Sequence, residues 1–267
     1  MKVGIVQMNT QDDKAANIAT ASRLIEKIAI QEGADLIVLP EYYAFLGSDA
    51  QSARDSGETP PEGDAYRAMS DLARRLEVTI HAGSIVEKDG NSFYNTTYVF
   101  GPDGKEIARY RKIHLFDVDV PGGLSYRESD MVGRGEEVVT YKVGDRTVGC
   151  SICYDLRFPE LFRALRDKGA EVIVLPAAFT LMTGKDHWEV LLRARAIETQ
   201  CWVVSCGQVF SHAGGTKACY GHSMVIDPWG QVTAMVPDMV GTTTSTLDFD
   251  RLADIREKLP VANDHVL

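Results

Sequence analysis

The chain has 267 residues, 45% hydrophobic and 25% charged, which is the balance of an ordinary globular protein. Its 28 basic and 38 acidic side chains give a net charge of −10 without any basic run, so we expect no nucleic-acid partner. No apolar stretch approaches the roughly 18 residues that cross a bilayer, and the N-terminus turns polar too early for a signal peptide. We therefore expect a cytoplasmic protein that does not associate with membranes.

The first elements along the chain form a strand–helix–strand unit. A buried strand is predicted over 2–8, and helical spacing of apolar residues predicts an amphipathic helix over 13–32, where Gly33 supplies a C-cap. The continuous apolar run 35–39 is typical of a parallel strand covered on both faces.

Further along, a second helix is predicted over about 62–76, ahead of strands near 78–86 and 93–100 and of a strand that ends near Tyr110. The stretch 112–135 has no clear periodicity. We expect a loop there, and a loop of that length in a compact domain is usually functional or partner-binding.

A repeat is the most informative feature of the chain. The segment GADLIVLP over 33–40 returns as GAEVIVLP over 169–176, with six of eight positions identical, and each copy follows a helix and a strand that begins Val-Gly. VFGPDG over 99–104 is echoed by VIDPWG over 225–230. Three echoes in the same order predict two similar halves with stacked mixed sheets, an α-β-β-α four-layer sandwich forming one domain over 1–267.

Ligands of open α/β sheets bind beyond the carboxyl ends of strands, where this chain has Glu41, Lys112 and Cys153. The repeat carries Ala177 at the place of Glu41, so the fold itself does not require that carboxylate. Cys153 is expected at a strand-to-helix turn, exposed in a concave position where helix N–H groups lower the pKa of the thiol. The other four cysteines are expected to be buried apolar residues.

Metal and redox sites are not expected. Cys150 and Cys153 form a C-x-x-C pair, but the pair closes a predicted strand over 146–153, in which positions three apart face opposite ways. A thiol nucleophile needs a base, usually histidine. His81 falls in a strand, His212 in a Gly-rich loop and His265 in the tail, which leaves three possible partners without metal-ligand spacing: His114, His187 and His222.

The motifs Leu-Pro-Glu41, Arg-Lys112-Ile-His-Leu-Phe-Asp and Cys153-Tyr-Asp-Leu-Arg-Phe-Pro-Glu resemble, in order and spacing, the three signatures of the nitrilase superfamily of carbon–nitrogen hydrolases. The likeness covers nearly the whole chain. The stretches 184–201 and 220–230 are most similar to the amidases of deaminated glutathione, with the omega-amidases as near relatives. This resemblance implies the same α-β-β-α sandwich, usually assembled as a homodimer, and no cofactor.

The resemblance also implies a role for each matched residue. Glu41 would be the general base, Cys153 the nucleophile that forms a thioester, and Lys112 the cation that holds the oxyanion together with the backbone N–H of Tyr154. Glu128, the further acid of the family, would orient the lysine or assist the attacking water.

The implied function is a thiol amidase that hydrolyses the terminal carboxamide of a small substrate, deaminated glutathione or an α-keto acid ω-amide, to a carboxylate and ammonia. A nitrilase or another carbon–nitrogen hydrolase with the same triad is the first alternative. A non-catalytic interaction protein on this fold is the second, and the intact triad argues against it. Departures from the family pattern over 211–216 and after Pro260 leave the acyl group open. We expect His222 and Arg157 to be structural, with Arg157 paired to an acid near the helix start.

Overall fold

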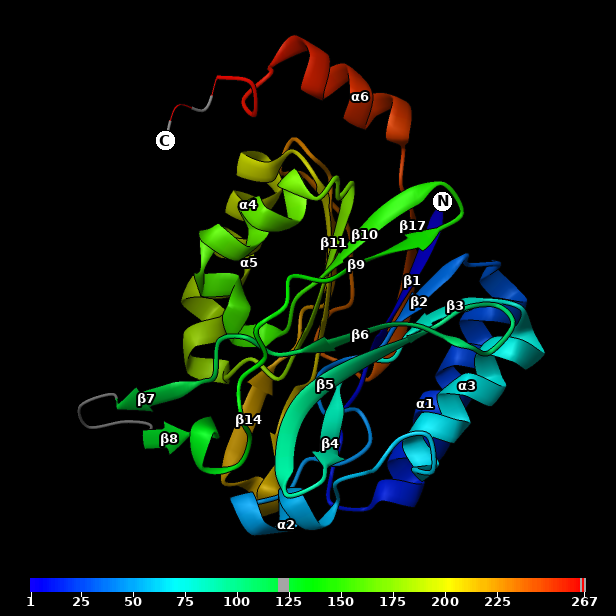
Figure 1. The fold of residues 1–267 in the computed structure, drawn as a ribbon, viewed down its shortest axis with the longest axis vertical. Coiled ribbons are helices and arrows are strands. Elements are labelled where there is room, and N and C mark those ends of the chain that lie inside the picture. Colours follow the sequence, from blue (N-terminus) through cyan, green and yellow to red (C-terminus); the bar gives the residue numbers. More distant parts are fainter. Residues whose placement is uncertain (120–124, 265, 267) are drawn as a thin grey trace.

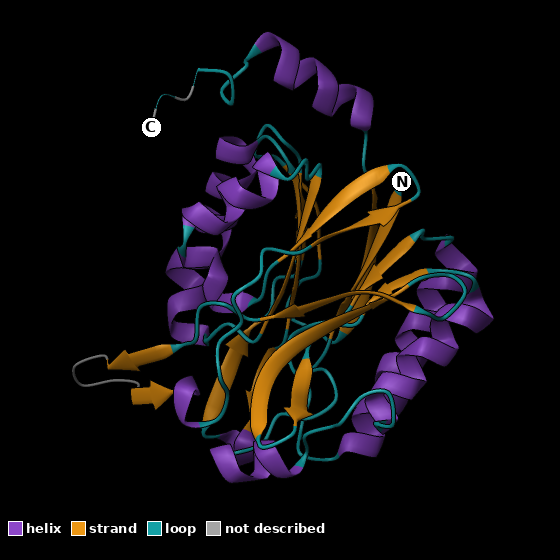
Figure 2. Ribbon diagram, viewed as in Figure 1, coloured by secondary structure: helices purple, strands orange, loops and turns teal. Residues whose placement is uncertain are grey.

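Two mixed β-sheets stack face to face and are covered by helices on their outer sides (Figure 1 and Figure 2). The computed structural model describes residues 1–119, 125–264 and 266. Four layers result, so the predicted α-β-β-α sandwich is confirmed. α1 and α3 cover the first sheet, α4 and α5 cover the second, and α6 lies beyond the layers near the C-terminus. The helices are α1 Lys14–Lys27, α2 Ala50–Asp55, α3 Asp64–Leu76, α4 Pro159–Asp167, α5 Leu181–Thr199 and α6 Phe249–Lys258.

The first sheet has seven strands in the order β17–β1–β2–β3–β5–β4, with β6 paired to β5. β1, β2 and β3 are parallel, and β17 and β5 flank them in the antiparallel sense. The strands are β1 Lys2–Gln7, β2 Leu36–Val38, β3 Thr79–His81, β4 Ile85–Asp89, β5 Ser92–Phe100, β6 Glu106–Arg111 and β17 Gly241–Thr246.

The second sheet repeats this plan with six strands in the order β16–β15–β12–β11–β10–β9. β10, β11 and β12 are parallel, and β9 and β15 flank them in the antiparallel sense. Its strands are β9 Thr140–Val143, β10 Arg146–Cys150, β11 Val172–Ala177, β12 Trp202–Gly207, β15 Met224–Ile226 and β16 Val232–Met235. The equal topologies confirm the two similar halves that the sequence repeat predicts.

The Val-Gly echo has a packing cause in each half. A Cβ on Gly4 would lie 2.4 Å from Cγ2 of Ile28, and a Cβ on Gly149 would lie 3.0 Å from Cδ2 of Leu165. Ile28 opens the π-helical turn that continues α1, and Leu165 belongs to α4. Glycine therefore lets a helix side chain approach the strand closely at the same place in both halves.

The helix predicted over 13–32 is present. Asp13 caps α1 by accepting the N–H of Ala16 at 3.0 Å, and a π-helical turn over Ile28–Glu32 extends it to Gly33, whose φ is +63°. A positive φ is costly for other residues, so glycine is the natural terminator there.

Strand β2 is buried on both faces, as its apolar run predicts. Leu36 and Val38 belong to the cluster that includes residues of β10 and β11 from the other sheet, whereas Ile37 and Leu39 pack in the cluster beneath α1 and α3. This alternation anchors the strand end that carries the first candidate residue.

Two of the predicted segments differ from the structure. The strand predicted over 146–153 ends at Cys150, because the side chain of Asp155 accepts the N–H of Ile152 at 2.8 Å and turns the chain into a 3₁₀ turn over Cys153–Arg157. The loop predicted over 112–135 contains, on either side of residues that lie outside the described part, β7 Asp117–Asp119, β8 Ser125–Arg127 and a 3₁₀ turn Glu128–Asp130.

The Gly-rich segment over 211–216 joins the two strands of a hairpin, β13 Val209–His212 and β14 Lys217–Tyr220.

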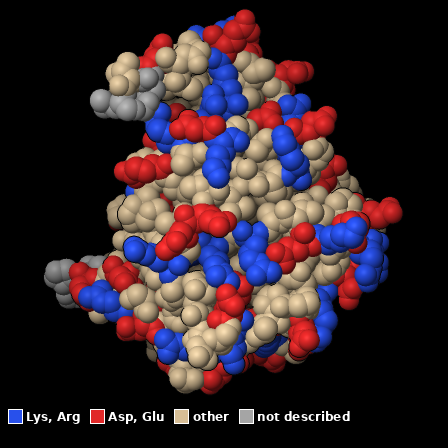
Figure 3. Space-filling model, in the orientation of Figure 1, with Lys and Arg blue, Asp and Glu red and all other residues tan. Residues whose placement is uncertain are grey.

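On the face drawn in Figure 3, acidic and basic side chains are interspersed. Within the described ranges, no helix combines the length and the apolar character needed to cross a membrane. His265, assigned above to the tail, lies outside the described residues.

Candidate active site

Three charged side chains meet in the interior of the sandwich. Glu41 follows β2, Lys112 follows β6, and Glu128 opens the 3₁₀ turn after β8. Nζ of Lys112 donates to Oε1 of Glu41 at 2.9 Å and to Oε2 of Glu128 at 2.8 Å. Each side chain is at most 2% exposed, so one cation is shared by two carboxylates away from water.

Two further residues, which sequence reasoning missed, complete this network. Nδ2 of Asn95 in β5 donates to Oε1 of Glu41 at 2.8 Å and to Oε1 of Glu128 at 3.0 Å. The hydroxyl of Tyr42 donates to Oε1 of Glu128 at 2.9 Å. The available signals were the position of Tyr42 directly after Glu41 and a polar Asn95 inside a strand.

Backbone N–H groups also donate to the two carboxylates. Ala178 donates to Oε2 of Glu41 at 2.7 Å, and Phe116 donates to Oε2 of Glu128 at 2.7 Å. Ala178 directly follows β11 of the second sheet, so Glu41 of the first half is bonded to the second half. The two sheets together therefore fix the geometry of the site.

Cys153 begins the 3₁₀ turn with φ of +47°, a strained backbone conformation for a residue other than glycine. The expectation of an exposed thiol is wrong, because Cys153 is only 8% exposed. The expected lowering of its pKa is also wrong. Burial raises the pKa of Cys153 and the charge of Glu41 raises it further, while Lys112 acts in the opposite sense. A single 3₁₀ turn offers too small a dipole to outweigh burial.

The same charges set the protonation of Lys112 and Glu128. Burial acts to lower the pKa of Lys112, but the charges of Glu128 and Glu41 outweigh it and raise that pKa well above its ordinary value. Burial acts to raise the pKa of Glu128, but the charge of Lys112 and the hydrogen bonds outweigh it and lower that pKa. Lys112 is therefore an ammonium ion and Glu128 a carboxylate at neutral pH.

The three histidines left open as bases have other partners. Nδ1 of His114 contacts Oδ1 of Asp155 at 2.7 Å, Nδ1 of His187 lies 3.3 Å from Nη1 of Arg157, and Nδ1 of His222 lies 3.0 Å from the carbonyl oxygen of Tyr220. In the described part of the chain, none of them hydrogen-bonds to Cys153. Nor do the described residues include a group of three or more His, Cys, Asp or Glu residues placed to hold a metal.

A small cavity of about 20 Å³ opens beside Cys153. The expectation that Arg157 pairs with an acid is wrong: its guanidinium lies 5.2 Å from the ring centroid of Phe179 and next to His187. The turn that carries Cys153 ends with Arg157, which lines this cavity. The lining residues are Phe116, Cys153, Tyr154, Arg157, Ala178, Phe179, Thr180 and Thr183.

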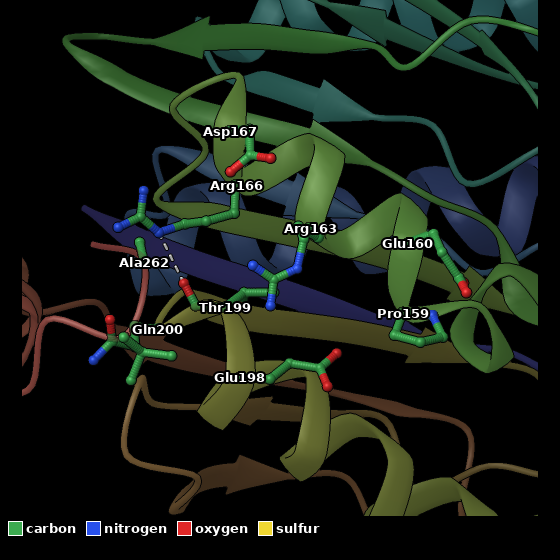
Figure 4. A pocket seen from close by; sticks show the side chains of 10 residues that line it. Pro159, Glu160, Arg163, Arg166, Asp167, Glu198, Thr199, Gln200 and Ala262 are labelled. Atoms are coloured by element: carbon green, nitrogen blue, oxygen red, sulfur yellow. Dashed lines mark hydrogen bonds between the residues drawn. The ribbon is translucent and has the colours of Figure 1, made fainter. Parts of the chain in front are cut away.

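A larger cavity of about 310 Å³ lies elsewhere, between α4, the end of α5 and the C-terminal segment (Figure 4). Arg166 donates to the carbonyl oxygen of Thr199 at 2.9 Å, and both acidic and basic side chains line the cavity. It contains none of the predicted site residues and no cysteine among its lining, so the smaller cavity is the candidate active site.

A buried Glu–Lys pair beside a cysteine, on an α-β-β-α sandwich, agrees with the resemblance of the three sequence motifs to the carbon–nitrogen hydrolases. The sequence profile of the carbon–nitrogen hydrolase family matches residues 2–257, and the chain belongs to that family. The predicted family is thereby confirmed. Hydrolysis of carbon–nitrogen bonds is the reaction class of this family.

Individual relatives agree with this assignment. The chain is 40% identical over 260 residues to the deaminated glutathione amidase of Synechocystis, covering 96% of this chain and 94% of that protein. It is 37% identical over 263 residues to human omega-amidase NIT2, covering 97% and 93%. The crystal structure of Nit3 of Saccharomyces cerevisiae, a member of branch 10 of the nitrilase superfamily, matches with a TM-score of 0.90 at 32% identity, covering 99% and 96%.

Proposed function

We propose that this protein is an amidase that releases ammonia from the terminal carboxamide of a small carboxylic acid, either deaminated glutathione or an α-keto acid ω-amide. The observation that carries the proposal is the position of Cys153 on a strained turn beside the buried pair of Glu41 and Lys112, whose charges both act on its thiol. The names of the relatives, which are amidases, support an amide over a nitrile. Since Glu41 and Cys153 come from different halves, residues 1–267 would act as one catalytic domain.

In the first half-reaction, the sulfur of Cys153 attacks the amide carbon while Glu41 takes the thiol proton. The raised pKa of Cys153 means that the thiol is neutral at rest, so proton transfer accompanies attack. Nζ of Lys112 and the N–H of Tyr154, at the start of the 3₁₀ turn, stabilise the oxyanion. The carbon–nitrogen bond then breaks and Glu41 returns the proton to the nitrogen. Ammonia is released, and the acyl group remains on Cys153 as a thioester.

In the second half-reaction, a water molecule attacks the thioester carbon and gives its proton to Glu41. The oxyanion forms in the same place, so Lys112 and Tyr154 stabilise it again. Breakage of the carbon–sulfur bond releases the carboxylic acid, and the proton on Glu41 returns to the sulfur of Cys153. The cycle needs no cofactor.

Of the two roles open to Glu128, we assign the orientation of Lys112. Its Oε1 accepts from Tyr42, Asn95 and Lys112, and its Oε2 accepts from Lys112 and Phe116. An oxygen with two or three donors has no free lone pair for a water molecule. Glu128 is therefore a positioning residue.

The charge near the nucleophile supports an anionic substrate. Arg157 lines the cavity of Cys153 and offers a planar set of donors suited to a carboxylate. Thr180 and Thr183 line the same cavity and add hydroxyl donors. An ω-amide of a dicarboxylic acid carries a carboxylate at the end opposite the amide, so both ends would find partners.

The test is ammonia release from a panel of matched substrates. We expect turnover of an α-keto acid ω-amide and none of the nitrile of the same length. Arg157→Gln should raise KM for the anionic amide by roughly 10- to 100-fold, the worth of a charge-assisted hydrogen bond, and leave a neutral amide unaffected. Arg163→Gln, in the larger cavity, is the matched control. Turnover of the nitrile alone would refute the amidase proposal.

We further propose that the protein is a homodimer or a higher homo-oligomer, as the family resemblance implies, and that it is cytoplasmic, as its composition and short apolar stretches lead us to expect. Light scattering of the purified protein at micromolar concentration is expected to give at least twice the 29.4 kDa chain mass. A monomer mass at that concentration would contradict the dimer. Fractionation of cells that express the protein would test its location.

A further inference from the structure

Asn95 lies at the centre of the charged network without touching the substrate cavity. It is fully buried in β5, and its single amide nitrogen donates to both Glu41 and Glu128. The backbone carbonyl oxygen of Asn95 accepts the backbone N–H of Lys112 at 2.9 Å. One residue therefore contacts both carboxylates and fixes the backbone of the cation between them.

The orientation of this amide follows from its neighbours. Only the NH₂ end can face two carboxylate oxygens, and its two hydrogen atoms supply one donor to each. The other end, Oδ1, has no hydrogen-bond partner among the described residues. Leaving a buried polar atom unpaired costs stability, so the residue is better explained by what its NH₂ group does than by packing.

Two buried carboxylates that converge on one cation can lower their repulsion by sharing a proton. A shared proton would occupy Glu41, which must be free of a proton to act as the base. The titratable groups that act on the pair, or on which the pair acts, are Tyr42, Lys112, Tyr126, Cys153 and Cys219. Of these, only Lys112 supplies a positive charge.

We propose that Asn95 is a positioning residue that gives Glu41 and Glu128 one N–H donor each, keeps their Oε1 atoms apart and prevents them from sharing a proton. This inference rests on the proposed role of Glu41 as general base. It explains why an amide, which cannot titrate, occupies a buried position between two acids. Asn95 acts through Glu41 and makes no contact with the substrate.

The experiment compares Asn95→Ala and Asn95→Asp with wild type. In Asn95→Ala, kcat should fall by roughly 100-fold, the effect of a misplaced catalytic group, while KM changes little because Asn95 does not line the cavity. The acid limb of the kcat/KM profile should move up by about one pH unit or more. Asn95→Asp keeps the shape but adds a third carboxyl, so its acid limb should move further.

Thr97→Val is the matched control. Thr97 is fully buried two residues along the same strand, and its hydroxyl donates to the carbonyl oxygen of Gly83 rather than to a carboxylate. This variant also removes a buried polar group. Because that group contacts neither Glu41 nor Glu128, the acid limb of the kcat/KM profile should stay in place. Equal acid limbs in wild type and both Asn95 variants would overturn the proposal. So would loss of folding in both Asn95 variants while Thr97→Val folds, since Asn95 would then be structural.

A second readout needs no turnover. pH-difference infrared spectroscopy detects the carbonyl band of a protonated buried carboxyl, and Glu41→Gln identifies the part that Glu41 contributes. As the pH is lowered, this band should appear in Asn95→Ala at a pH about one unit higher than in wild type. If wild type releases no ammonia from any amide, the proposed function fails, but a shifted band would still support the role of Asn95. An unshifted band would refute that role.

Discussion

Cys153→Ala is expected to lower ammonia release by on the order of 10⁴-fold or more, because losing a nucleophile removes the whole covalent route. The substitution removes one sulfur atom at a turn and keeps the Cβ, so the backbone with φ of +47° is no more strained than before. Mass spectrometry after substrate is added should find an acyl adduct on the wild type and none on the variant. Circular dichroism should show that both are folded.

Cys150→Ala is the control for this experiment. Cys150 is buried in β10 only three residues earlier, yet it takes no part in the charged network. It should keep most of the turnover. EDTA should also leave turnover unchanged, and loss of activity that zinc restores would contradict a cofactor-free reaction. Ammonia release by Cys153→Ala at the wild-type rate would refute the assignment of Cys153 as the nucleophile.

Glu41→Gln and Lys112→Met should both impair turnover but shift the pKa of the Cys153 thiol in opposite directions. Glu41→Gln removes the base, so turnover should fall by about 10²-fold or more. It also removes the negative charge that raises the pKa of Cys153, so that pKa should fall. Lys112→Met keeps a similar volume but removes the cation that favours the thiolate. Turnover should then fall by roughly 10²- to 10³-fold, as for loss of an oxyanion donor, and the pKa of Cys153 should rise.

The rate of alkylation of Cys153 by iodoacetamide across pH measures both shifts. The alkylation profile should move to lower pH in Glu41→Gln and to higher pH in Lys112→Met, with Cys153→Ala giving the background of the other thiols. Lys112→Met leaves two buried carboxylates without their cation, so thermal unfolding should show a loss of about 3–5 kcal/mol. If both profiles match wild type, neither residue acts on the thiol, and His187 becomes the candidate base.

Much of this site could be predicted because its residues sit where strands end. Glu41 follows an apolar run that can only be a covered strand, and its repeat at Ala177 shows that the carboxylate is not part of the fold's own pattern. Lys112 carries no such local signal, and only the family motif distinguished it from a surface cation. The structure then places both in one buried ion pair.

What could not be predicted depends on contacts between segments that are far apart in the sequence. Asn95 reads as one more residue of a strand, since nothing in the local sequence reports that its amide meets two acids from other segments. The burial of Cys153 was missed for the same reason: a strand-to-helix turn is exposed in an isolated half. Arg157 was assigned an acid partner from its helix, but aromatic rings and His187 surround it instead.

The bond between Glu41 and the N–H of Ala178 has a consequence for the symmetry of the molecule. Glu41 and Ala177 are equivalent positions of the two halves, and the bond brings these equivalent strand ends against each other. A second acid at the buried position 177 would add a carboxylate next to the residue that binds Glu41, although Lys112, the cation of the described network, is already shared by Glu41 and Glu128. The two halves therefore meet at equivalent strand ends that carry different residues, so the candidate site is asymmetric although the fold around it is duplicated.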